Sequence, residues 1–205
     1  MDRRLMAVIV LAMLSGVILG YVVALVNFQS YVGGLLVEIE DLNTLVEDLQ
    51  RRVDDLRSSL EFRVLGVYFS PNGGCEDQVI YWIGRANETI YIMMYNFTLD
   101  SVGDALIDAH RRGVKVMIVL EKSQITQYSE YRRLKEAGIM IRNDTNPNLM
   151  HNKVMIVDGL IVLTGSFNWS WSAENRNNEN LIVIRSRQIA AIYMEEFWRI
   201  WKSAE

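Results

Sequence analysis

The 205-residue sequence contains one cysteine, two histidines and two prolines, and it has no excess of positive charge. The single cysteine, Cys75, excludes an intramolecular disulfide, and one cysteine with two histidines is too few for a zinc finger. The formal net charge is −4, whereas a tight nucleic-acid binder usually carries a strongly basic surface. Composition therefore excludes a disulfide scaffold and leaves only a local basic patch as a means of attracting nucleic acid.

Charge is distributed unevenly along the chain. Residues 1–30 carry two arginines against one aspartate, and residues 31–61 carry three arginines against eight acidic residues. Residues 62–205 carry 16 basic and 16 acidic residues. Each segment also has its own hydrophobic pattern, so we predict an N-terminal transmembrane anchor over 1–30, a coiled-coil stalk over 31–61 and a folded domain over 62–205.

The segment from Leu5 to Val26 has no charged residue over 22 positions. As a helix it would be about 33 Å long, enough for a hydrocarbon core of about 30 Å. Arg3 and Arg4 precede it, so the positive-inside rule places the N-terminus in the cytoplasm and the rest outside the cell membrane. The alternatives are a signal peptide cleaved near residues 22–24, giving a secreted protein, and a buried soluble helix. Signal peptides have shorter apolar runs of about 7–15 residues, so an uncleaved single-pass anchor is expected.

The next segment shows a heptad repeat. Apolar residues recur at alternating steps of four and three: Leu35, Ile39, Leu42, Val46, Leu49, Val53, Leu56 and Leu60. Mostly β-branched residues at position a with leucine at position d favour a parallel two-stranded coiled coil. The alternative is an amphipathic helix that packs on its own domain. Tyr31, Gly33 and Gly34 are predicted to form a hinge before the coil.

From Phe62 onward, short apolar runs alternate with amphipathic segments. Strands are predicted over 64–69, 89–95, 114–120, 139–142 and 181–185, and helices over 76–86, 99–111, 125–137 and 188–202. Two further strands, 154–157 and 160–163, flank Asp158-Gly159, a strong hairpin-turn signal. Alternating β and α units predict an α/β fold in which helices sandwich a mixed β-sheet.

Polar and small residues accompany this hairpin at fixed spacings: His151, Lys153, Asp158, Gly165, Ser166, Asn168 and, eleven residues later, Glu179. Side chains two residues apart on a strand point to the same face, so His151 and Lys153 should lie together. Ser166 and Asn168 repeat this spacing after the second strand. The pattern predicts a polar cluster at one end of an apolar hairpin.

Such a cluster suits a reaction at a phosphate. Lys153 is a cation with three donors, and Ser166 and Asn168 add neutral donors that stabilise charge on the phosphate. His151 can act as nucleophile or proton carrier near neutral pH, and Glu179 can fix its tautomer. The sequence shows no cluster of metal ligands, so we expect neither a metal nor another cofactor. The alternative is a structural histidine on a hairpin.

The spacing H-x-K-x4-D-x6-G-S-x-N is met at every fixed position, and through it the chain resembles the phospholipase D superfamily. The resemblance covers about residues 62–203 and includes the segments 69–74, 95–98 and 112–114. The chain is most similar to small members with one motif, namely bacterial endonucleases and the mitochondrial cardiolipin hydrolase/Zucchini group. The resemblance implies a phospholipase D-like catalytic domain over 62–205.

The resemblance also implies a mechanism and residue roles. One histidine attacks phosphorus and forms a phosphohistidine, and a second protonates the leaving oxygen and later activates water. His151 would be that histidine, Lys153 and Asn168 would hold the phosphate oxygens, and Glu179 would orient His151. Ser166 would donate to the phosphate or tether Glu179. The remaining motif residues, Asp158 and Gly165, are expected to be structural.

Two such motifs are required, and this chain has one. Its other histidine, His110, lies beside Arg111 and Arg112 in a predicted helix with none of the signature around it. A second chain must therefore supply the second motif, and a C2 homodimer with a composite site on its axis does so. The parallel coil and the shared anchor fit the same arrangement.

The sequence leaves the substrate open. A membrane-anchored endonuclease acting on DNA or RNA is favoured by the small size and single motif. A phospholipase acting on cardiolipin or another phospholipid is favoured by the anchor. Against it, a helical coil of 26 residues would hold the active site about 39 Å from the bilayer that contains the lipid. An inactive membrane scaffold is the third possibility, and the intact signature argues against it.

Overall fold

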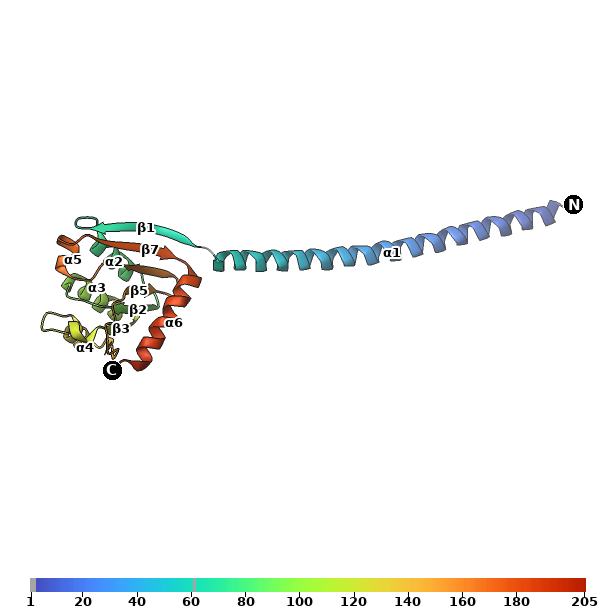
Figure 1. Cartoon of the computed structure of the whole chain (residues 1–205). Helices are drawn as coiled ribbons and strands as arrows, with labels where there is room; N and C mark the ends of the chain where they lie inside the picture. Colours follow the sequence, from blue (N-terminus) through green and yellow to red (C-terminus); the bar gives the residue numbers. More distant parts are fainter. Residues whose placement is uncertain (1–2, 61) are drawn as a thin grey trace. The chain divides into compact units, whose positions relative to one another are not determined.

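The computed structural model describes residues 3–60 and 62–205, and it comprises two units, Met1–Leu56 and Arg57–Glu205. Helix α1 spans Arg3–Leu60, so the predicted anchor and stalk form one helix (Figure 1). Its Ile9–Arg57 part is long and apolar enough to cross a membrane. The ends of the two predicted segments, residues 1, 2 and 61, lie outside the described residues, as do the side chains of residues 3–5, 7, 8 and 58–60.

The hinge predicted at Tyr31, Gly33 and Gly34 is not a break in the helix, because α1 is continuous through these residues. A glycine inside a helix lowers stability by only about 1 kcal/mol relative to alanine, which a helix of this length tolerates. The seven heptad residues from Leu35 to Leu56 are exposed, with exposed fractions of 41–62%. The side chain of Leu60 lies outside the described part. The pairing of two such helices stays a prediction.

The second unit contains a seven-stranded mixed sheet, as predicted. Its strands are β1 (Arg63–Ser70), β2 (Thr89–Met94), β3 (Lys115–Leu120), β4 (Met140–Asn143), β5 (Lys153–Val157), β6 (Ile161–Gly165) and β7 (Glu179–Arg185). The order across the sheet is β1-β7-β6-β5-β2-β3-β4. The pairs β2–β3 and β3–β4 are parallel, and the other four pairs are antiparallel.

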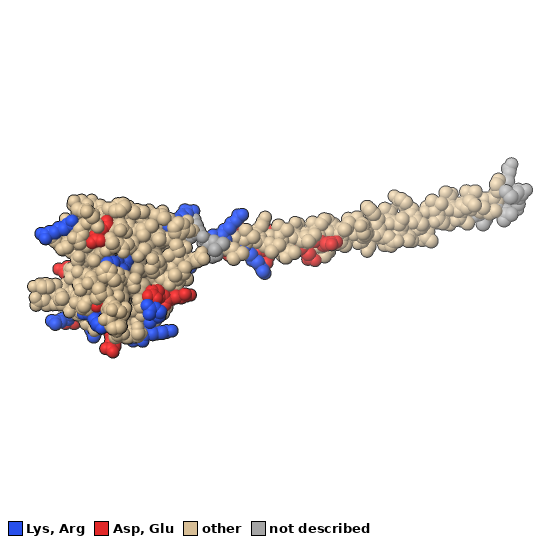
Figure 2. Space-filling view, viewed as in Figure 1, with Lys and Arg blue, Asp and Glu red and all other residues tan. Residues whose placement is uncertain are grey.

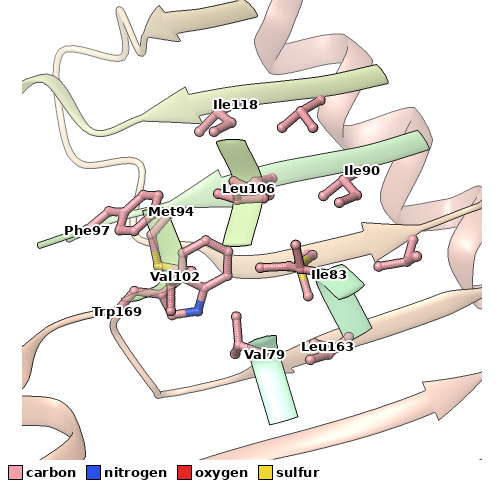
Figure 3. Packing of buried hydrophobic residues seen from close by; sticks show 14 of the residues in the cluster. Val79, Ile83, Ile90, Met94, Phe97, Val102, Leu106, Ile118, Leu163 and Trp169 are labelled. Atoms are coloured by element: carbon pink, nitrogen blue, oxygen red, sulfur yellow. The ribbon is translucent and has the colours of Figure 1, made fainter. Parts of the chain in front are cut away.

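Helices cover both faces of this sheet: α2 (Cys75–Gly84), α3 (Asp100–Arg111), α4 (Tyr131–Glu136), α5 (Trp171–Asn175) and α6 (Arg187–Ser203), with a 3-10 turn at Lys122–Gln124. Alternate residues of β2 enter two cores, Ile90 and Ile92 on one face and Met93 on the other. The first core packs against α2 and α3, as Figure 3 shows for Val79, Ile83, Val102 and Leu106 around Ile90, Ile118 and Leu163. The second core packs against Phe197 and Ile200 of α6.

Strand β1 is an edge strand, and among the described residues it pairs only with β7. Its apolar side chains Val64, Leu65, Val67 and Phe69 are 41–61% exposed. Elsewhere on the face in view, Figure 2 shows basic and acidic side chains interspersed over residues 62–205. This mixture agrees with the balanced charge of that part of the sequence.

The structure differs from the predicted helices in two places. The helix predicted over 125–137 is present only at Tyr131–Glu136. Thr126 bonds locally instead, because its hydroxyl accepts from Tyr128 N at 3.2 Å and its carbonyl accepts from Ser129 Oγ at 2.9 Å. Such side-chain bonds compete with helix formation. Helix α5, a single turn after the motif, was not predicted.

Candidate active site

The predicted hairpin is formed by β5 and β6. The central residues of its turn, Asp158 and Gly159, have φ of 51° and 58°, as a type I′ turn requires. The register pairs Lys153 with Met94 and Ser70 with Glu179, so β2 ends where β5 begins and β1 ends where β7 begins. We call this end of the sheet the motif end and the opposite end, at Asp158, the turn end.

His151 and Lys153 lie together at the motif end. The Lys153 ammonium is 3.0 Å from His151 Nδ1 and 3.2 Å from Nε2, and it donates to the His151 carbonyl at 3.0 Å. His151 is exposed, whereas Lys153 is only 7% exposed. The chain therefore presents an accessible imidazole directly against a buried cation.

Tyr95 completes this group. Its ring centroid is 4.3 Å from that of His151 and 4.7 Å from the Lys153 ammonium. Gln124 donates to the Tyr95 hydroxyl at 3.1 Å, which fixes the ring. Burial lowers the pKa of Lys153 from 10.5 to about 8, and the charge of Glu179 opposes part of that shift. Lys153 is thus cationic at neutral pH but poorly solvated, a state that favours binding an anionic oxygen.

The other motif residues surround this pair. Ser166 Oγ accepts from Asn180 N at 3.1 Å and from Asn180 Nδ2 at 3.3 Å, and donation from its hydroxyl to a phosphate or to Glu179 stays a prediction. A Cβ on Gly165 would lie 2.1 Å from the Asn180 carbonyl oxygen, so only glycine permits this close approach. Asn168 Oδ1 is buried and has no hydrogen-bond partner among the described residues. A half-turn of that amide would place a free donor there.

Glu179 accepts a hydrogen bond from Asn177 Nδ2 at 3.1 Å. Within the described part of one chain, no hydrogen bond joins Glu179 to His151, so its orienting role stays a prediction. His110 lies in the last turn of α3, before β3 begins at the turn end. One chain therefore does not bring His110 to His151.

Asp158 lies at the turn end, away from the reacting groups. Its carboxylate accepts from the backbone N–H groups of Asn87, Glu88 and Thr89, each at 2.9 Å. Burial raises the pKa of Asp158, but these hydrogen bonds outweigh burial and hold it below its ordinary value. The residue fastens the hairpin turn to the start of β2, in agreement with the predicted structural role.

Sequence reasoning missed Glu121, which directly follows β3. Its carboxylate is 1% exposed and accepts from Met150 N at 2.8 Å and from Ser123 N at 3.0 Å. Burial raises its pKa, and the hydrogen bonds from Ser123 and Met150 bring it below the ordinary value. Glu121 thereby holds the residue immediately before His151. The available sequence signal was an acid directly after a strongly apolar strand.

A groove of about 630 Å³ lies beside His151. It is lined by the loop before β5, residues 144–147 and 149–152, and by Glu196, Arg199, Ile200 and Ser203 of α6. Most of these residues are polar, so the groove suits a polar group next to the reacting phosphate. In the described residues, no three His, Cys, Asp or Glu side chains are grouped closely enough to hold a metal ion.

Known proteins share this sequence pattern. The family model described as cardiolipin synthase, PLD-like domain, matches residues 79–201. Phospholipase D of Rickettsia prowazekii is 40% identical over 131 residues, which are 63% of this chain and 64% of that protein. Phospholipase D of Rickettsia typhi is 38% identical over 140 residues, 68% of this chain and 69% of that protein. The chain thus matches about two thirds of the length of each.

Two further similarities concern length and fold. A mitochondrial cardiolipin hydrolase of Chlamydomonas reinhardtii is 28% identical over 197 residues, covering 80% of this chain and 88% of that protein. The crystal structure of Nuc from Salmonella typhimurium, a phospholipase D family member, superposes with a TM-score of 0.67 at 34% identity. That superposition covers 71% of this chain and 97% of Nuc.

Proposed function

The chain belongs to the phospholipase D superfamily of phosphodiester hydrolases, and from this premise we propose that it is a membrane-anchored endonuclease that cleaves DNA or RNA without a metal. The observation that carries the chemistry is the exposed His151 imidazole held 3.0 Å from the buried Lys153 ammonium. A nucleophile and a fixed cation at that separation can contact one phosphate together.

In the proposed reaction, a ring nitrogen of His151 attacks phosphorus. The P–N bond forms as the bond to the leaving oxygen breaks, and a second histidine gives that oxygen a proton. Lys153 and Asn168 hold the non-bridging oxygens, where negative charge develops. Water, deprotonated by the second histidine, then cleaves the P–N bond and restores His151.

The second histidine comes from a second copy of the chain. His110 lies near the turn end, so it does not serve the site of its own chain. A C2 homodimer places the partner subunit's His151 across the axis from the first. Coiled-coil pairing through the exposed heptad residues of α1 supports the same dimer.

The polar groove beside His151 favours a nucleic-acid strand over an acyl chain. A sugar or base of the leaving strand suits its polar lining, whereas a lipid tail would need apolar walls. The second candidate is a phospholipase, and the names phospholipase D and mitochondrial cardiolipin hydrolase among its relatives favour it. An inactive scaffold would have no need of the complete His151–Lys153 arrangement.

The apolar part of α1 supports a membrane anchor with the N-terminus in the cytoplasm and the catalytic domain outside. A signal sequence is the alternative for the same segment. Separation of membranes from soluble protein distinguishes the two, because only an uncleaved anchor stays with the membrane.

The substrate is tested with the full-length protein in detergent micelles, in the presence of EDTA. Single-stranded DNA, RNA and cardiolipin vesicles are offered separately, with His151→Asn as the inactive control. We expect shortened DNA or RNA fragments and no product from cardiolipin. Hydrolysis of cardiolipin alone would establish the phospholipase instead, and no turnover together with no trapped phosphohistidine would establish the scaffold.

A further inference from the structure

An exposed tryptophan and an arginine lie in contact just after the motif. Trp171, the first residue of α5, is 55% exposed, and the guanidinium carbon of Arg176 lies 4.7 Å from its ring centroid. Trp169, two residues earlier, is 2% exposed and fills the first core. The two tryptophans, two residues apart, therefore lie in different environments, and packing in the core explains only the buried one.

The backbone that carries the exposed ring is held in place by hydrogen bonds. Ser170 caps the helix, accepting from Ala173 N at 3.3 Å, and Ala173 is buried. Asn175 Nδ2 donates to the Trp171 carbonyl at 2.9 Å. The exposure of Trp171 is therefore a property of an ordered turn.

Arg176 is available to a ligand. Among the described residues, no carboxylate forms an ion pair with it. Glu174, the acid nearest in sequence, accepts from Glu76 N at 3.1 Å and is thereby turned toward α2. The guanidinium keeps its donors for an acceptor from outside the chain, and phosphate oxygens match its forked geometry.

The pair lies at the motif end of the sheet, between motif residues in the sequence. Trp171 is three residues after Asn168, and Arg176 precedes Asn177, whose amide donates to Glu179 at 3.1 Å. Ser70, at the motif end of β1, donates to the Asn177 carbonyl at 3.2 Å. A strand whose phosphate lies at His151 would therefore pass Trp171 within a few nucleotides.

We propose that Trp171 and Arg176 form a stacking platform for an unpaired nucleobase of the strand being cut, with the guanidinium contacting a flanking phosphate. This inference rests on the proposed endonuclease function and narrows its substrate to single-stranded nucleic acid. Bases in a duplex cover each other's faces, whereas an unpaired base can stack on an indole and an arginine. The platform also explains how a domain with no net charge can hold a polyanion.

The test measures binding by the full-length His151→Asn protein in detergent micelles, which does not cut its ligand. Fluorescence anisotropy compares a single-stranded oligonucleotide with an abasic strand of equal length. Trp171→Leu should weaken binding of the normal strand about 5- to 150-fold and leave the abasic strand unchanged, because one stacked base is lost. Trp171→Phe keeps a ring and should bind within about threefold of the parent.

Arg176→Ala should weaken binding of both the normal and the abasic strand. It should also reduce the salt dependence of that binding, because a phosphate contact is lost. The matched control is Tyr81→Leu. Tyr81 is 47% exposed and has Arg85 5.0 Å from its ring, but Arg85 lines a pocket with Asp158 at the turn end. The control should leave binding of both strands unchanged.

Three results would overturn the platform. The first is unchanged binding of the normal strand by Trp171→Leu. The second is loss of the dimer in the Trp171→Leu variant, measured by sedimentation, which would make Trp171 a subunit contact. The third is weaker association of the Trp171→Leu variant with anionic vesicles while its oligonucleotide binding is unchanged, which would make Trp171 a membrane contact.

The controls separate other causes. Circular dichroism checks each variant, and Trp171→Gln replaces Trp171→Leu if the latter misfolds. If the endonuclease proposal itself is wrong, the His151→Asn protein with Trp171 intact will not bind the oligonucleotide at all.

Discussion

Replacing Lys153 with methionine should stabilise the protein while abolishing turnover. Methionine has a similar length and fills the same site, but it removes a cation that is 7% exposed. The pKa of Lys153 is lowered from 10.5 to about 8, mainly by burial, so keeping the charge in the folded protein costs about 3 kcal/mol. The substitution also loses the bond from the charged ammonium to the His151 carbonyl, worth about 1.5 kcal/mol, and the Tyr95 contact, worth about 0.5–1 kcal/mol.

The net gain in the free energy of unfolding is therefore about 0.5–1 kcal/mol, or roughly 1–4 °C in Tm for a domain of this size. The gain should depend on pH. Below pH 8 the folded wild type carries the full penalty of a buried cation. Between pH 8 and 10.5 the folded protein has released a proton that the unfolded chain still binds, so wild-type stability rises toward that of the variant.

Thermal unfolding of the full-length protein in detergent, followed at pH 7 and at pH 10, measures this difference. The matched control is Lys135→Met, because Lys135 also lies over a tyrosine ring, at 5.2 Å, but is exposed. It should change Tm little at either pH. A Lys153→Met protein less stable than wild type at pH 7, or a difference that does not narrow at pH 10, would refute the argument from desolvation.

Four further outcomes follow from the proposed site and stalk. Turnover should survive EDTA, since Lys153 supplies the positive charge; loss in EDTA with rescue by a divalent ion would contradict this. His151→Asn should abolish turnover with fold and dimer intact, and mixed dimers with wild type should also be inactive; half activity would show independent subunits. Val46→Cys, made with Cys75→Ser, should cross-link under mild oxidation, and its failure to do so would remove parallel pairing. Glu121→Gln should lower the free energy of unfolding by about 1–3 kcal/mol in denaturant titrations and reduce kcat, whereas unchanged values would show that the Met150 bond is unimportant.

The hairpin and the mixed sheet were predictable because their signals are local. The two apolar runs around Asp158-Gly159 predict the hairpin, and the structure contains it as β5 and β6. Val157 pairs with Ile161, so Leu160 belongs to the turn and not to the strand predicted over 160–163. The grouping of His151 with Lys153 followed from the same strand periodicity. The apolar segment of residues 5–26 was also visible in the sequence, but the continuity of α1 through Tyr31, Gly33 and Gly34 was not.

The missed features depend on distant or very short segments. Glu121 and Met150 are 29 residues apart, and no sequence pattern connects a strand end to that backbone N–H. Helix α5 has five residues, too few to show helical periodicity. The bond from Asn180 to Ser166 Oγ was also not predicted, because it depends on the pairing of β6 with β7. Donation from Ser166 to a phosphate or to Glu179 stays a prediction.

The exposed edge strand β1 affects how a shortened protein would behave. A fragment starting at Phe62 would have this apolar strand at its free end, with Val67 and Phe69 exposed and one row of backbone groups unpaired. Such edges favour strand-to-strand aggregation between molecules. Two features of β1 oppose it, namely the basic residue Arg63 at its start and the shift in pairing register between Val64 and Gly66. Oligomers of that fragment would therefore mix sheet extension with true subunit pairing, so solubility screening must precede any measurement of its association.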